Sequence, residues 1–352
     1  MLYPLKFNPV YKNYLWGGRN LEKFGRTLPE GKVAESWDLS CHPDGVSIVA
    51  NGAFEGQSLP ELLKIQKSRI IGDRFSNAHI EQFPLLIKLI DANDRLSVQV
   101  HPDDEYAAVY EEGGLGKNEM WYILDAKPGA KLVYGVAPGV TREGFEEALK
   151  DNRLESCLRY VEVRAGDVVN IPAGVVHAIG EGIVLAEIQQ SSNTTYRVYD
   201  YDRVDSEGKK RALHVRQALE VIKFEPSGRK EKAVGLTVEL DASSRKTYVV
   251  ANRFFAAELY NVNGKTLEKA NGSKFHIYIF TEGEGKIEYY SGGFTGFKTG
   301  ETVLIPAHLG DYTLQGAFKA LKAYIPDLKN DIVDPLRAAG HSQDSIYKMI
   351  TD

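Results

Sequence analysis

The chain has 352 residues, 26% of them charged, and carries a net charge of −5. This near balance gives no basic field of the kind that nucleic-acid binding needs, so an anionic substrate has to be held by local Arg and Lys side chains. No run of about 18 apolar residues and no leader-like N-terminal segment occurs, which argues against a membrane partner. The two cysteines, Cys41 and Cys157, are too few for a disulfide scaffold. We expect a cytoplasmic protein of two domains, or of one domain with a long insertion.

The first 100 residues predict strands around one helix. Residues 1–50 alternate short apolar stretches with Gly and Pro, which is typical of strands and turns. Ser58 precedes a predicted helix from about 59 to 68, where it can serve as the N-cap. The apolar runs 85–90 and 96–100 predict a central strand pair, because turn-forming residues separate them.

The rest of the chain also predicts mostly strands. Thr141 caps a predicted helix that ends near residue 150. The other predicted elements are strands at 158–164, 167–171 and 183–190, a helix at 214–223, strands over almost all of 235–325, and a short helix at 344–350.

A motif that occurs twice in the sequence predicts that the strands are divided between two related units. Gly166-x5-Pro172-Ala173 recurs as Gly300-x5-Pro306-Ala307, and in both copies an apolar strand runs into a Pro turn. Many short strands at this spacing favour barrels or sandwiches over a parallel α/β sheet. We therefore predict a mainly β protein of two related barrels with a few short helices. Residues 1–230 would form the first barrel, and residues 231–352 would form the second barrel and a C-terminal tail.

Polar side chains on the strands of the first half predict a metal site. Gln99 and His101 lie two residues apart, so both side chains leave the same face of a strand. Glu119 opens an apolar run, and His177 follows a turn in which Pro172 fixes the backbone. Imidazole nitrogen, carboxylate and amide oxygen suit Zn²⁺ best, with Fe²⁺, Mn²⁺ and Co²⁺ as alternatives.

The second half has no comparable set. The residue that matches His177 in the second copy is Asp311, and no Gln-x-His accompanies it. We therefore predict a metal-free second barrel. Two other histidines have ordinary interpretations: His42 is predicted to lie in a turn, and His276 in the core or on the solvent face of a strand.

These motifs resemble a known family. The second signature of the cupin barrels resembles the stretch Gly166-x5-Pro172-x-Gly174-x2-His177. The other motifs, given next, resemble the type I mannose-6-phosphate isomerases and look closest to the short bacterial branch of that family. Those remaining motifs are Tyr14-Leu15-Trp16-Gly17-Gly18, Glu35-Ser36-Trp37, Gln99-Val100-His101-Pro102-Asp103-Asp104, Lys117-Asn118-Glu119 and Glu187-Ile-Gln-Gln-Ser-Ser-Asn193-Thr-Thr-Tyr-Arg197. The resemblance covers roughly residues 1 to 325.

The resemblance implies cupin-type (jelly-roll) barrels and one Zn²⁺ per chain. The implied zinc ligands are Gln99, His101, Glu119 and His177. Arg197 is the implied catalytic arginine, and Lys117 the implied lysine beside the metal glutamate. Two departures matter: other branches carry Asp where this chain has Asn193, and a His-Lys pair where it has Gly116-Lys117. The proton-transfer base is therefore open.

The implied reaction interconverts mannose 6-phosphate and fructose 6-phosphate through a cis-enediol. Arg197 would offer permanently charged donors to the enediolate or to the phosphate. Lys117 would relay a proton or contact the phosphate, and the sequence leaves both roles open. Trp16 would line the sugar pocket, although core packing is the commoner fate of tryptophan.

Two other classes of function remain open. One is a different metallo-cupin enzyme, such as a non-haem iron dioxygenase or a sugar epimerase, and Gln99 argues modestly against the dioxygenase. The other is a non-catalytic regulator that binds sugar phosphates, although no helix-turn-helix or basic patch is present. We expect a monomer or a homodimer.

Overall fold

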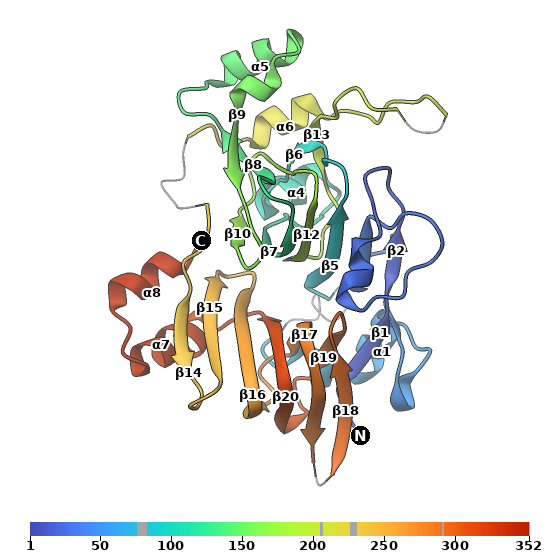
Figure 1. Ribbon diagram of the computed structural model, residues 1–352, viewed down its shortest axis with the longest axis vertical. Helices are drawn as coiled ribbons and strands as arrows, with labels where there is room; N and C mark the ends of the chain where they lie inside the picture. Colours follow the sequence, from blue (N-terminus) through green and yellow to red (C-terminus); the bar gives the residue numbers. More distant parts are fainter. Residues whose placement is uncertain (76–82, 205–206, 226–230, 291, 352) are drawn as a thin grey trace.

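The structure is a computed structural model that describes residues 1–75, 83–204, 207–225, 231–290 and 292–351. The described chain is mainly β with a few short helices, as predicted, and its strands form three sheets (Figure 1). Within these residues the sheets are consistent with cupin folding, although no hydrogen-bonded closed barrel is present. The predicted domain boundary falls at residue 230, outside the described residues, so the division there stays a prediction.

A six-stranded antiparallel sheet, ordered β10-β7-β12-β5-β3-β2, lies between the other two sheets. Its strands are β2 (Val10–Lys12), β3 (Glu35–Leu39), β5 (Leu85–Ala92), β7 (Glu119–Ala126), β10 (Val168–Ile171) and β12 (Ile183–Gln190). β5 and β12 are buried along their whole length, because both faces of the sheet are covered.

A five-stranded sheet, ordered β13-β6-β11-β8-β9, faces one side of the six-stranded sheet. Its strands are β6 (Val98–Val100), β8 (Lys131–Val136), β9 (Leu158–Glu162), β11 (His177–Ile179) and β13 (Tyr196–Tyr199). Apolar residues of helices α5 (Arg142–Lys150) and α6 (Val215–Val221) cover its outer face.

A nine-stranded sheet makes up the second half, and strands from the N-terminus complete it. The order is β14-β15-β16-β20-β17-β19-β1-β4, with β18 paired to β17. Its strands are β1 (Leu5–Asn8), β4 (Ile48–Val49), β14 (Leu236–Glu239), β15 (Arg245–Ala251), β16 (Ala256–Ala270), β17 (His276–Tyr289), β18 (Gly293–Lys298), β19 (Thr302–Ile305) and β20 (Gly310–Tyr324). The first residues of the chain therefore pair with the second half.

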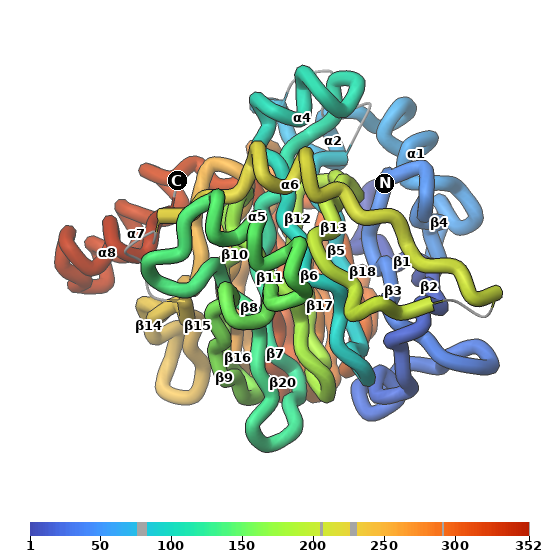
Figure 2. Tube along the Cα trace, turned by 90° about the horizontal axis from the view of Figure 1, so that it is seen from above, coloured from blue at the N-terminus to red at the C-terminus, as the bar shows by residue number. Residues whose placement is uncertain are grey.

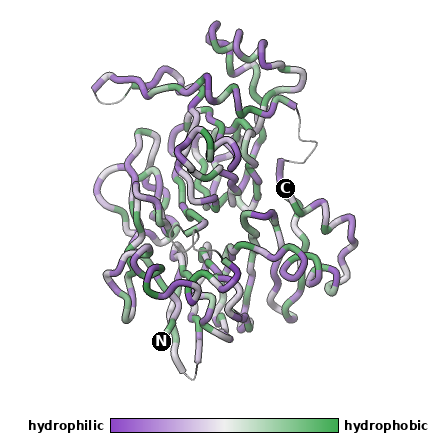
Figure 3. Tube along the Cα trace, turned by 180° about the vertical axis from the view of Figure 1, so that it is seen from behind, coloured by the Kyte–Doolittle hydropathy of each residue, from purple (hydrophilic) through white to green (hydrophobic). Residues whose placement is uncertain are grey.

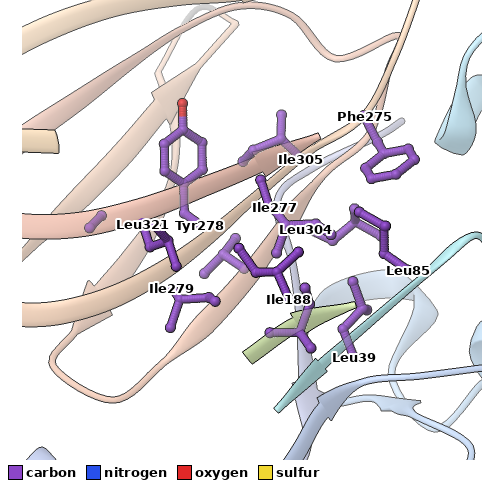
Figure 4. Close-up of a cluster of buried hydrophobic side chains, with 14 of the residues drawn as sticks. Leu39, Leu85, Ile188, Phe275, Ile277, Tyr278, Ile279, Leu304, Ile305 and Leu321 are labelled. Carbon is purple, nitrogen blue, oxygen red and sulfur yellow. The ribbon is translucent and has the colours of Figure 1, made fainter. Parts of the chain in front are cut away.

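One hydrophobic core joins the two halves. Leu39, Leu85 and Ile188 from the six-stranded sheet pack against residues of the nine-stranded sheet such as Ile277 and Leu304 (Figure 4). These side chains are fully buried. Hydrophilic residues gather instead on the outlying loops (Figure 3).

The helices are short and lie outside the sheets. The remaining ones are α1 (Leu59–Gln66), α2 (Ser68–Ile71), α4 (Asp104–Tyr110), α7 (Asp334–Ala338), α8 (Gln343–Met349), the 3₁₀ turns η1 (Asn20–Phe24), η2 (Gly52–Phe54) and η3 (Leu154–Cys157), and the π-helical turn η4 (Leu328–Val333). The predicted caps are confirmed, since the Ser58 side chain accepts from the Glu61 N–H and Thr141 from the Gly144 N–H. The predicted helix 59–68 is too long, because Lys67 has φ 48° and separates α1 from α2.

The predicted pairing of runs 85–90 and 96–100 is wrong. The first run is β5 in the six-stranded sheet, and the second contains β6 in the five-stranded sheet. The turn residues between them carry the chain from one sheet to the facing one. Turn composition alone cannot distinguish a hairpin from such a crossing, because both need the same backbone conformations.

The C-terminal tail packs on the nine-stranded sheet. Ile332, Leu336, Ile346 and Met349 form a buried cluster with residues of that sheet. The tail and the N-terminal strands lie on opposite sides of the molecule (Figure 2). Among the described residues, no helix has the length and apolar character that a membrane span requires.

Candidate metal centre

Strand register places three predicted site residues side by side in the five-stranded sheet. Gln99 on β6 lies directly opposite Arg197 on β13 and directly opposite His177 on β11. Residues directly opposite one another in antiparallel strands point to the same face. Arg197, Gln99 and His177 therefore form one row across the sheet.

His101 and Glu119 complete a buried cluster with His177. His101 follows the end of β6, and Glu119 is the first residue of β7 in the facing sheet. One ligand atom from each of the three side chains lies within 4.8 Å of the others. All three are at most 1% exposed, so the cluster is shielded from bulk water.

Backbone carbonyls orient both histidines. His101 Nδ1 lies 2.8 Å from the Thr194 carbonyl oxygen, and His177 Nδ1 lies 2.9 Å from the Val175 carbonyl oxygen. Since a carbonyl only accepts, each Nδ1 carries the proton and each Nε2 lone pair faces the cluster. Metal-binding histidines are commonly held in this way.

Lys117 contacts two members of the cluster. Its Nζ is 2.6 Å from Glu119 Oε1 and 3.2 Å from His101 Nε2. Burial lowers the pKa of His101 to about 3, and Lys117 contributes to this. Burial also lowers the pKa of His177. For Glu119 burial acts to raise the pKa, but Lys117 and His101 outweigh it and hold the pKa well below its usual value.

The residues present fit a divalent cation. Glu119 Oε2 is buried and, among the described residues, accepts no hydrogen bond. Gln189, the cross-strand neighbour of Glu119, likewise has a buried amide oxygen with no partner in the described chain. Leaving such acceptors buried costs about 1–3 kcal/mol each unless something binds them. Two imidazole nitrogens and a carboxylate are suitable zinc ligands.

Gln99 lies next to this cluster. Its amide Nε2 is 3.3 Å from His177 Nε2. For Gln99 to offer an oxygen as a ligand, the amide has to be turned so that Oε1 takes the place of Nε2. Its role as a fourth ligand therefore stays a prediction.

A second charged group lies beside the cluster, and the sequence reasoning did not assign it. Lys88 Nζ is 3.3 Å from Glu187 Oε1 and 3.6 Å from Glu35 Oε2. Trp121, whose ring is 5.4 Å from that of His177, donates its Nε1–H to Glu187 at 2.8 Å. Burial and the nearby Glu119 raise the pKa of Glu187.

The sequence did hold a signal for this group. Lys88 and Glu187 are each flanked on both sides by apolar residues of a buried strand, in the runs LLIKLI and IVLAEI. A charged residue in a buried strand requires a partner of opposite charge, because an unpaired buried charge is very costly. Register then pairs the two directly across β5 and β12.

Arg197 is half-buried and held in place from two sides. It donates from Nε to Ser97 Oγ at 3.3 Å and from Nη1 to the Ala212 carbonyl at 2.9 Å.

Trp16 lies in the core between the two sheets, with its ring 5.7 Å from Tyr14. Its role as a sugar contact stays a prediction.

Two residues of the second half, Asp311 and His276, were considered in the prediction of the metal site. Asp311 is exposed and pairs with Lys269 at 3.5 Å, whereas His276 is a buried core residue.

A cavity of about 1080 Å³ opens beside Tyr3 and Phe294, and no residue of the metal cluster lines it. Among the described residues, those that line this cavity include no group of metal-ligand atoms comparable to the cluster.

Comparison with known proteins gives consistent matches. Residues 4–132 match the family model "Phosphomannose isomerase type I, catalytic domain", and residues 244–325 match "Mannose-6-phosphate isomerase, cupin domain". Mannose-6-phosphate isomerase ManA of Bacillus subtilis is 38% identical over 323 residues, which cover 92% of this chain and 99% of ManA. Mannose-6-phosphate isomerase of Streptococcus mutans is 34% identical over 92% of this chain and 99% of its own length.

A solved structure matches as well. The crystal structure of mannose 6-phosphate isomerase from Bacillus subtilis superposes with a TM-score of 0.83 at 33% identity, over 92% of this chain and 99% of that one.

Proposed function

Because the chain belongs to the type I phosphomannose isomerase family, we propose that it interconverts mannose 6-phosphate and fructose 6-phosphate through a cis-enediol, with one bound Zn²⁺. The observation that carries the proposal is the buried His101, Glu119 and His177 cluster, in a chain 38% identical to a mannose-6-phosphate isomerase over nearly its whole length. We further expect a cytoplasmic monomer or homodimer with a sugar phosphate as its small-molecule partner.

The proposed zinc ligands are His101, Glu119, His177 and Gln99. When bound, the cation supplies a Lewis acid that polarises substrate oxygens. The three buried side chains among these come from both facing sheets, so the packed sheets would hold them in place before metal binds.

Proton transfer between C1 and C2 needs a group that both takes and gives a proton. Glu187 is suited to this role because its raised pKa lies closer to neutrality than that of an ordinary carboxylate. Lys88 and Trp121 hold its two oxygens. Lys117 either relays a proton or contacts the phosphate.

Arg197 would stabilise negative charge on the enediolate or bind the phosphate. Its hydrogen bonds to Ser97 and Ala212 fix the guanidinium before substrate arrives. Fixed donors of this kind cost no reorganisation during the reaction.

The test is a coupled assay of fructose 6-phosphate formation from mannose 6-phosphate, on the protein as purified, after chelation and after Zn²⁺ is restored. We expect activity to vanish on chelation and return with zinc, and Glu119→Gln to lose both bound zinc and activity. His308→Gln is the matched control, because His308 pairs with Asp73 at 3.0 Å on the surface and touches none of these residues. Full turnover after verified removal of the metal would contradict the metal role, and no turnover in any state would contradict the isomerase assignment.

A further inference from the structure

Two segments far apart in the sequence meet through Asp44 and Asn193. Asn193 Nδ2 donates to Asp44 Oδ2 at 2.8 Å across a sequence separation of 149 residues. Asp44 lies in the loop after β3, and Asn193 lies between β12 and β13. The amide thus fixes a carboxylate whose side chain is 56% exposed and can still reach a ligand.

His42 forms a pair with the same carboxylate. Its Nδ1 lies 3.5 Å from Asp44 Oδ2, and the Asp44 backbone N–H donates to that nitrogen at 3.2 Å. In the part of the chain that the structure describes, Nε2 of His42 has no hydrogen-bond partner. An imidazole and a carboxylate are therefore presented together.

Two separate chains of contacts connect this pair to the metal centre. On one side, Asn193 precedes Thr194, whose carbonyl holds His101 Nδ1 at 2.8 Å. On the other side, the His42 ring packs edge-on against Trp37 at 6.0 Å, and Lys88 Nζ lies 5.0 Å from the Trp37 ring.

The isomerase function requires that the sugar ring be opened, and no residue of the buried cluster has been assigned to that step. A hexose 6-phosphate is mainly a closed ring in water, and no enediol forms until the C1–O5 bond has broken. Opening the ring removes a proton from the O1 hydroxyl and delivers one to O5. Glu187 and Lys117 are buried beside the proposed metal ligands, and the proposed function gives each of them a different task.

We propose that His42 and Asp44 open and close the sugar ring at the edge of the metal centre, an inference that rests on the proposed isomerase function. Asp44 takes the proton of the O1 hydroxyl, and the C1–O5 bond breaks with its electron pair going to O5. Neutral His42, whose Nδ1 accepts from the Asp44 N–H, gives its Nε2 proton to O5 while Nδ1, 3.5 Å from Asp44 Oδ2, takes the proton that Asp44 removed from O1. Exchange with water then moves the ring proton from Nδ1 back to Nε2, which restores the pair. Asn193 acts as a positioning residue for Asp44.

The experiment compares Asp44→Asn and His42→Gln with the wild type on mannose 6-phosphate carrying hydrogen or deuterium at C2. We expect kcat/KM to fall roughly 10²-fold in each variant, as for loss of a general acid or base. The deuterium isotope effect on kcat/KM should become smaller than that of the wild type, because ring opening then limits the rate. A residue that only maintains the fold would not reduce the isotope effect.

Two further variants sharpen the test. Asp73→Asn removes the carboxylate of the His308–Asp73 surface pair and should leave both rate and isotope effect unchanged. The double variant Asp44→Asn with Asn193→Asp exchanges carboxylate and amide across the same hydrogen bond, and recovery of rate there supports the proposal. An isotope effect in Asp44→Asn and His42→Gln equal to or larger than that of the wild type would overturn it. Absence of turnover in the wild type would instead contradict the isomerase function itself.

Discussion

Lys117 Nζ lies 2.6 Å from Glu119 Oε1, so a lysine ammonium shares the carboxylate that a metal ion would need. The same nitrogen is 3.2 Å from His101 Nε2, the lone pair of which faces the cluster. A buried cation and a buried ammonium repel each other strongly at such short range. We therefore expect Lys117 to limit the affinity of the site for metal.

Replacing this lysine should tighten metal binding. We expect Lys117→Met to bind Zn²⁺ at least about tenfold more tightly, because a positive charge next to the ligands is removed. Turnover should fall at the same time. Competition with a chromophoric chelator measures the affinity, and Lys127→Met, at an exposed lysine paired with Glu181, is the control. Unchanged or weaker zinc binding in Lys117→Met would show that the ammonium does not oppose the cation.

Arg197 should not tolerate replacement by lysine. Arg197→Lys keeps the charge but loses the forked contacts to Ser97 and Ala212, so we expect kcat/KM to fall roughly 10²- to 10³-fold. Steady-state kinetics on mannose 6-phosphate measure this. Arg216→Ala removes an almost fully exposed arginine on α6 and should have no effect. Near-full turnover in an Arg197→Ala variant would remove Arg197 from the mechanism.

Glu258 should make stability depend on acid pH. It is 2% exposed, with Lys246 Nζ 3.1 Å from its Oε2. Burial acts to raise the pKa of Glu258, but Lys246 and Lys322 outweigh it and lower the pKa to about 2. A carboxylate with a depressed folded pKa contributes stability above its unfolded pKa of about 4.3 and loses it as the pH falls towards the folded value.

The expected contribution is roughly 3 kcal/mol, lost between about pH 4.5 and pH 2. Urea unfolding at several pH values measures it, and Glu258→Gln should be less stable at pH 6 with a flatter profile below pH 4.5. Equal slopes for the two proteins would contradict the assignment of this pH dependence to Glu258.

The core shared by the two halves should make them unfold together. Ile188 is fully buried between the six-stranded and nine-stranded sheets (Figure 4), and Ile188→Ala should cost about 2–5 kcal/mol. All 3 tryptophans, Trp16, Trp37 and Trp121, lie in the first half, so their fluorescence reports on that half alone. We expect the fluorescence and far-UV circular dichroism midpoints to shift by the same amount. Ile65→Ala, at a side chain 66% exposed, is the control, and separate midpoints would show that the halves unfold independently.

The sequence by itself determined features that depend on neighbours in the chain. Ser58 and Thr141 cap helices because a short polar side chain reaches an N–H three residues ahead. Gly166 and Gly300 adopt positive φ at matching turns, as the repeated motif indicates. The family resemblance, carried by several motifs together, is confirmed by relatives that span nearly the whole chain.

Only the tertiary structure decided which strands pair and which charges meet. Runs 85–90 and 96–100 enter different sheets, and β1 joins the sheet of the second half. Strand pairing is set by burial and register over long sequence distances, and local spacing does not contain that information. The same holds for side chains. Lys88 in a buried strand requires a carboxylate partner, but the amino-acid sequence does not show that Glu187 is that partner. Asp44 and Asn193 likewise meet only because the fold brings together two loops that are 149 residues apart in the sequence.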